Sequence, residues 1–144
     1  MSDTVEDFFE KMRKFDFSVL NPGIVIVEDN GDLRMRLVRH FRQLEFNVYA
    51  APNFDEAEKL IDFYRTMHCA LIDDKVPQQL GGAPEELADR LYDCFVEKFS
   101  GIKVFAFAEE PEKLQRAYKR IIPKITPVGV VATMIAHDYA AGEK

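Results

Sequence analysis

The chain contains 144 residues, of which 47% are apolar, and its formal net charge is −6. This length and composition favour a single globular domain and exclude an intrinsically disordered chain. The acidic balance argues against nucleic-acid binding and against binding to a membrane surface. Because no apolar run reaches transmembrane length and no signal-peptide pattern is present, a cytoplasmic location is expected. Cys69 and Cys94 lack metal-type spacing, so we expect buried thiols rather than a disulfide.

The first segment, residues 1–20, is expected to form an amphipathic helical extension ahead of a domain that covers residues 21–144. Phe8, Met12 and Phe15 recur there at helical spacing. This aromatic side could pack on the domain, or it could contact a partner, including a second copy in a homodimer. A proline and a glycine then interrupt the chain before the first strand.

Strands and helices are then expected to alternate. The aliphatic run 24–27 lacks polar alternation, which is typical of a strand buried on both faces of a parallel sheet. A second short strand is expected over residues 47–51. Helices are expected over residues 31–44 and from Asn53, a candidate N-cap, to about residue 64. The expected inward positions are Leu33, Leu37, Phe41 and Leu44 in the first helix and Phe54, Ala57, Leu60, Ile61 and Tyr64 in the second.

The second half of the chain continues this alternation. Residues 69–73 predict a third buried strand, and a glycine-containing loop follows. Pro84-Glu85-Glu86 has the proline and the acids typical of a helix start. The buried positions of that helix are expected to be Leu87, Leu91, Cys94 or Phe95, and Phe99. The last expected elements are a strand over 102–108, a short helix over 111–120, a strand over 121–125, and a helix begun by Thr126-Pro127 with Val128, Val131, Ile135 and Tyr139 inward.

Five strands alternating with helices predict an α/β fold with right-handed crossovers and helices on both faces of a parallel sheet. A flavodoxin-like three-layer sandwich with strand order 2-1-3-4-5 fits this count. In that order the first and third strands are neighbours. The order therefore predicts that Glu28 and Asp29 lie beside Asp73 at one edge of the sheet.

Two acidic clusters follow buried strands, and ligands of open α/β sheets gather outside the carboxyl ends of the strands. The first cluster is Glu28-Asp29, and the second is Asp73-Asp74. Carboxylates collected at one edge repel one another. A hard divalent cation with oxygen ligands, such as Mg²⁺, would relieve that repulsion.

Over residues 23–140 this pattern resembles the receiver domain of two-component response regulators. The acidic pair that closes the family's first strand appears here as Glu28-Asp29, and the leucine-rich helix follows it. Asp73 ends the third strand and precedes Pro77 by four positions, which is the spacing of the family's phosphoacceptor aspartate. The late lysine of the family corresponds to Lys124.

The resemblance implies a role for each of these residues. Asp73 would accept a phosphoryl group as an acyl phosphate. Mg²⁺ would be held by Asp29, Asp73 and the backbone carbonyl of Lys75, and through water by Glu28. Lys124 would pair with the phosphoryl group. It also implies a histidine kinase or phosphotransfer protein as donor and a downstream protein partner, with no enzymatic activity expected.

The chain departs from the family at the positions that, in the family, respond to phosphorylation and transmit it to partners. Phe107 stands where the family has Thr or Ser, whereas Ala108 keeps the small residue that follows and contacts the phosphoryl group. Ile121 stands at the aromatic switch position, and Ile125 replaces the proline after the lysine. The short chain between Phe107 and Lys124 also implies that the family's fourth helix is short or irregular.

Three functions remain open from these residues. The domain could accept phosphate and signal through an altered surface, which we favour. It could instead be a pseudo-receiver, a phosphorylation-independent protein-interaction module. A small phosphatase of the haloacid dehalogenase type also places an aspartate after a buried strand, but Asp73-Asp74-Lys75 lacks its Asp-x-Asp motif. A basic run is interpreted as the solvated face of a helix and not as a nucleic-acid site: Arg34, Arg36, Arg39, His40 and Arg42.

Overall fold

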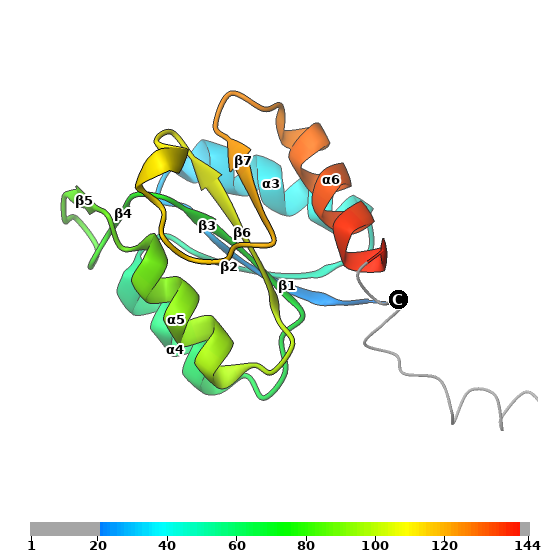
Figure 1. The fold of residues 1–144 in the computed structure, drawn as a ribbon, viewed down its shortest axis with the longest axis horizontal. Coiled ribbons are helices and arrows are strands. Elements are labelled where there is room, and N and C mark those ends of the chain that lie inside the picture. The colour runs from blue at the N-terminus through cyan, green and yellow to red at the C-terminus, as the bar shows by residue number, and fades with distance from the viewer. Residues whose placement is uncertain (1–20, 142–144) are drawn as a thin grey trace, which may run out of the picture.

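The computed structural model describes residues 21–141 (Figure 1). Its strands are β1 (Gly23–Val27), β2 (Asn47–Ala51), β3 (Cys69–Asp73), β4 (Val76–Pro77), β5 (Pro84–Glu85), β6 (Lys103–Ala108) and β7 (Arg120–Pro123). The helices are α3 (Gly31–Gln43), α4 (Phe54–Phe63), α5 (Ala88–Lys98) and α6 (Val128–Ala141), with one 3₁₀ turn, η1 (Pro111–Lys113). The predicted extension over residues 1–20 lies outside the described residues.

The central sheet has five parallel strands in the order β2-β1-β3-β6-β7. This confirms the predicted flavodoxin-like order, with β6 and β7 as the fourth and fifth strands of the sheet. Every residue of β1 and β3 is buried, because helices cover both faces of the sheet. Two-sided burial explains why these strands are continuous apolar runs without polar alternation.

Helices cover both faces of the sheet, which makes three layers (Figure 1). Helices α3 and α6 pack on one face, where Ile26, Leu71 and Phe105 point into their shared core. Helices α4 and α5 pack on the other face over Val25 and Ile72. Alternate residues of one strand enter opposite cores because successive side chains of a strand point to opposite faces.

The helix starts follow from local capping. The side chain of Asn30 accepts a hydrogen bond from Leu33 N, and that of Asn53 accepts one from Glu56 N. The predicted N-cap at Asn53 is therefore confirmed. The prediction that Leu44 faces inward is wrong: it is 42% exposed, because α3 ends one residue earlier.

The predicted helix start at Pro84-Glu85-Glu86 is also wrong. Pro84 and Glu85 form β5, which pairs antiparallel with β4, and α5 begins only at Ala88. Backbone pairing with the chain after β3 replaces the helical hydrogen bonds that the proline and acids would have begun. Of the two residues that the sequence left open as the buried position of α5, Phe95 is buried and Cys94 is only half-buried.

The helix predicted over residues 111–120 is reduced to the 3₁₀ turn η1. Few residues separate Pro111 from β7, and so short a helix is marginal without tertiary support. Polar contacts to α5 hold the segment in an irregular form instead. Arg116 pairs with Asp93, and the Tyr118 hydroxyl donates to Asp89 at 2.8 Å. Strand β7 also ends two residues earlier than predicted, which leaves Ile125 94% exposed.

Two further expectations concern the chain as a whole. Cys69 is buried and Cys94 half-buried, and no disulfide joins them. Within residues 21–141, no helix combines the length and the apolar character needed to cross a bilayer.

Candidate functional site

The acidic pair at the end of β1 is held by its own backbone and by α3. Glu28 is almost fully buried, and its Oε2 accepts a hydrogen bond from Asn30 N at 3.2 Å. Asp29 is exposed. The pair therefore offers one carboxylate fixed inside the site and one that faces solvent.

Strand pairing brings Asp73 to this acidic pair. Because β1 pairs with β3 in parallel, with Val27 opposite Ile72, both strands end at the same edge of the sheet. Glu28, Asp29 and Asp73 each offer one carboxylate oxygen within 4.8 Å of the others. This is the convergence predicted from the sequence. Three oxygen donors of this kind fit a hard divalent cation such as Mg²⁺, and the exposed Asp29 leaves a route for its entry.

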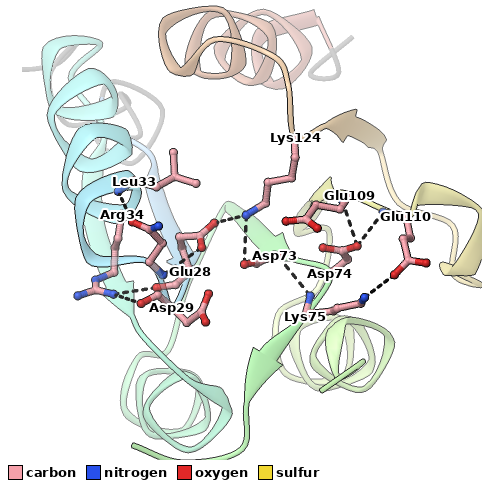
Figure 2. Close-up of polar contacts among 11 residues, drawn as sticks. Glu28, Asp29, Leu33, Arg34, Asp73, Asp74, Lys75, Glu109, Glu110 and Lys124 are labelled. Carbon is pink, nitrogen blue, oxygen red and sulfur yellow. Dashed lines mark hydrogen bonds and ion pairs between the residues drawn. The ribbon is translucent and has the colours of Figure 1, made fainter. Parts of the chain in front are cut away.

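Lys124, in the loop after β7, reaches the same site (Figure 2). Its Nζ lies 2.7 Å from Glu28 Oε1 and 3.2 Å from Asp73 Oδ2. The backbone N–H of Lys124 donates to Ala108 O at 3.0 Å, which fixes the loop against the end of β6. One ammonium therefore bridges two carboxylates that come from two different strands.

Burial and crowding shift the protonation of these groups. Burial, followed by the negative charge of Glu28, raises the pKa of Asp73 to about 9, against the opposing effect of Lys124. Burial alone would lower the pKa of Lys124. The hydrogen bond to Glu28 and the charges of Asp73 and Glu28 outweigh it, so that pKa lies above the ordinary lysine value. The arrangement therefore strongly favours any additional positive charge.

Asp74 lines the same cavity as Asp73, and its carboxylate also binds the backbone of a neighbouring loop. It is buried, and its Oδ2 accepts hydrogen bonds from Glu109 N at 3.1 Å and Glu110 N at 3.0 Å. Its own N–H donates to Phe107 O. The sequence suggested only a neighbour of Asp73. Its acceptor role was not predictable, because the loop that it binds lies thirty-five residues further along the chain.

The two altered positions differ in their surroundings. Phe107 is buried in the core between the sheet and α3 with α6, and Lys124 Nζ lies 5.0 Å from the centre of its ring. A phenyl ring offers the lysine a cation–π contact but no hydrogen bond. Ile121 is half-buried on β7, and Ala108 is fully buried at the end of β6.

Arg34 also supports the acidic site, which the sequence pattern did not predict. Its guanidinium donates to Glu28 O at 2.9 Å and more weakly to Asp29 O (Figure 2). It therefore fixes the backbone of the acidic pair, whereas the basic run of α3 had been interpreted as solvated. The spacing could have indicated this, since Arg34 lies one helical turn after the Asn30 cap.

The sequence matches no protein-family model and no curated protein. The structure, however, resembles solved response-regulator receiver domains. A CheY-like receiver domain protein from Methanospirillum hungatei superposes with a TM-score of 0.67 at 16% identity, covering 85% of this chain and 97% of that one. The receiver domain of HemR from Leptospira biflexa gives 0.67 at 20% identity, with 83% and 94% covered.

A response regulator from Burkholderia pseudomallei, solved with a phosphorylated aspartic acid, a calcium ion and citrate, gives a TM-score of 0.60 at 14% identity. The match covers 86% of this chain and 76% of that one. At such identities the likeness establishes the fold, and it agrees with the strand order described above.

Proposed function

We propose that this chain, which has the fold of a receiver domain, accepts a phosphoryl group on Asp73 and signals through contacts with other proteins. One observation carries the proposal: carboxylate oxygens of Glu28, Asp29 and Asp73 converge within 4.8 Å while Lys124 bridges Glu28 and Asp73. Glu28 and Asp73 are buried, so the site gathers two enclosed carboxylates, an exposed third one and an ammonium at the carboxyl edge of the sheet.

The phosphoryl donor is proposed to be a phosphohistidine on a histidine kinase or phosphotransfer protein. A carboxylate oxygen of Asp73 attacks phosphorus, an O–P bond forms, and the N–P bond to the imidazole breaks. The leaving imidazole keeps the electron pair and takes up a proton. The solved relative from Burkholderia pseudomallei carries a phosphorylated aspartic acid, which supports this chemistry on the same fold.

Residues of this chain would position and neutralise the transferred group. Asp29, Asp73 and the Lys75 carbonyl would hold Mg²⁺, with Glu28 acting through water; a bound Mg²⁺ neutralises charge on the phosphoryl oxygens. Lys124 would leave Glu28 in part and pair with the phosphoryl group as a point charge. Ala108, which has no bulk beyond its Cβ, would leave room for a phosphoryl oxygen at the end of β6.

The test is incubation with acetyl phosphate and Mg²⁺, followed by intact-mass measurement. The wild type should gain the mass of one phosphoryl group, and Asp73→Asn should gain none. Asp62→Asn, an exposed aspartate on α4, is the matched control and should behave like the wild type. Absence of modification in the wild type, or equal modification of Asp73→Asn, would refute the proposal.

The second candidate is a pseudo-receiver that binds partners without phosphorylation. Phe107 favours it, because its buried ring fills the position at which the family has a hydroxyl and packs against Lys124. This candidate predicts no mass gain with acetyl phosphate in any variant. The third candidate, a small phosphatase, predicts repeated turnover of p-nitrophenyl phosphate, and a receiver would not show it.

A further inference from the structure

Residues 109–119, between β6 and β7, contain the short turn η1 and are otherwise irregular, and ion pairs help to hold them. Lys113 pairs with Glu86 at 3.0 Å and with Glu110 at 3.1 Å. Further along, Arg116 pairs with Asp93 on α5. These ion pairs are partly exposed and hold the segment weakly, whereas Leu114 and Tyr118 pack against the core beneath α4 and α5.

Lys75 connects this segment to the acidic site. Lys75 lines the cavity that also contains Glu28, Asp73 and Lys124, and its ammonium is paired with Glu110 (Figure 2). Lys75 and Lys124 are the two lysines that line this cavity within the described chain. Lys75 thus borders both the site and the segment.

Separating Lys75 from Glu110 requires little free energy. Both side chains are about one-third exposed, so water screens their attraction. Glu110 also keeps Lys113 as a partner when Lys75 departs. Asp74 holds the Glu109 and Glu110 backbone in place, so the loop would remain attached at its base while its side-chain contacts change.

A phosphoryl group on Asp73 would compete with Glu110 for Lys75. It brings close to two negative charges at neutral pH into a partly buried cavity, whereas Glu110 offers one carboxylate that it already shares with Lys113. The Lys75 backbone N–H donates to Asp73 Oδ1 at 3.2 Å, which keeps the base of the lysine beside the phosphoacceptor.

We propose that Lys75 is a second phosphoryl-binding ammonium, which exchanges Glu110 for the phosphoryl group and so loosens segment 109–119 when Asp73 is phosphorylated. This inference rests on the phosphoacceptor role proposed for Asp73. It assigns the readout of phosphorylation to an ion-pair exchange in a chain that has Phe107 where a hydroxyl would otherwise respond.

The test uses the full chain with Mg²⁺ and beryllofluoride, a mimic of the phosphoryl group. Beryllofluoride affinity is measured by ¹⁹F NMR titration, and amide exchange of residues 109–119 by hydrogen–deuterium exchange. Lys75→Met should weaken beryllofluoride binding, because an ammonium is lost. Glu110→Gln should strengthen it, because Lys75 is released from its competitor. Each change should be roughly two- to fivefold, the range expected for a partly exposed ion pair.

Lys75→Met and Glu110→Gln break the same ion pair. If the pair only supported the structure, both variants would shift beryllofluoride affinity in the same direction, whereas an exchange of Lys75 between Glu110 and the phosphoryl group predicts shifts in opposite directions. Lys59→Met is the control: it removes an exposed lysine that pairs with Glu56 on α4 and does not line the acidic cavity, so beryllofluoride affinity should be unchanged. In the wild type, beryllofluoride should speed exchange of segment 109–119 by roughly two- to fivefold. Without beryllofluoride, the amides of segment 109–119 should exchange faster in Glu110→Gln than in the wild type.

Two failures can be told apart. If beryllofluoride does not bind the wild type, the phosphoacceptor proposal fails, and the exchange proposal fails with it. If beryllofluoride binds but the two variants shift its affinity in the same direction, or segment 109–119 exchanges at an unchanged rate, only the role of Lys75 is overturned.

Discussion

Lys124 Nζ lies 2.7 Å from Glu28 Oε1, although ninety-six residues separate them along the chain. The pair joins the end of β1 to the loop after β7 across the top of the sheet. Glu28 is 2% exposed and its carboxylate would otherwise be an uncompensated charge in a site that also contains Asp73. The lysine is therefore both a functional candidate and a requirement of the fold.

Lys124→Met should destabilise the chain by about 3 to 5 kcal/mol, because it leaves a buried carboxylate without its partner. Urea unfolding followed by circular dichroism measures the loss. The matched control is Lys59→Met, which removes an exposed lysine–glutamate pair on α4 and should cost at most about 1 kcal/mol. A similar loss in both variants would show that the buried bridge contributes nothing special. Added Glu28→Gln should restore part of the stability of Lys124→Met.

Asp29→Asn should weaken Mg²⁺ binding with little effect on the stability of the metal-free chain, because Asp29 is exposed whereas its oxygen contributes to the convergent set. Thermal unfolding at increasing Mg²⁺ provides the measurement, since a ligand at 100 times its Kd stabilises by about 2.7 kcal/mol. Asp32→Asn, an exposed acid in the first turn of α3, is the control. An equal response to Mg²⁺ in Asp29→Asn and wild type would remove Asp29 from the metal site.

Phe107→Thr should lengthen the lifetime of the acyl phosphate, because the new hydroxyl could donate a hydrogen bond to a phosphoryl oxygen. It should also cost about 3 to 5 kcal/mol of stability, because a buried ring is lost. Phe105→Thr is the matched control: Phe105 is buried in the same core, one alternation further from the site, so it loses stability without a gain in lifetime. The rate of mass loss after removal of acetyl phosphate measures the lifetime. Equal lifetimes in Phe107→Thr and Phe105→Thr would count against this role.

The Arg120–Asp138 pair should stabilise the chain in a pH-dependent way. Arg120 donates to both carboxylate oxygens of Asp138, at 2.6 and 2.8 Å, and this hydrogen bonding lowers the pKa of Asp138. A lowered carboxyl pKa means that the contribution is present above the ordinary value of about 4 and is lost as pH falls through the folded-state pKa. Arg120→Met should therefore lower the stability at pH 7, and the loss should become progressively smaller towards pH 3.

Urea midpoints of wild type and Arg120→Met across that range measure this effect. Arg65→Met, which removes an exposed arginine outside the pair, is the control and should show no such trend. A difference between wild type and Arg120→Met that stays constant from pH 7 to pH 3 would exclude the carboxyl of Asp138 as its source.

Local patterns in the sequence predicted the elements that depend on local chemistry or on full burial. The aliphatic runs of β1 and β3 could hardly form anything but doubly covered strands, and Asn53 capped its helix as its side chain requires. The adjacency of those strands then placed Glu28, Asp29 and Asp73 together. Segments with competing tertiary partners were predicted less well. Pro84-Glu85 had helix-start chemistry but paired with β4. The helix over residues 111–120 is only a short turn, as the shortened chain between Phe107 and Lys124 had implied.

The sequence by itself determined the strands and the parallel sheet, because these follow from side-chain periodicity and from the rules of right-handed crossover connections. The flavodoxin-like order that fits their count predicted the edge at which the acids gather, and the structure confirmed it. Only the tertiary structure decided which partner each charged group takes. Asp74 binds the backbone of Glu109 and Glu110, Arg34 binds the backbone of the acidic pair, and Lys75 pairs with Glu110. The reason is physical: periodicity is a short-range property of the chain, whereas an ion pair depends on which distant segments the packed cores bring within a few ångströms.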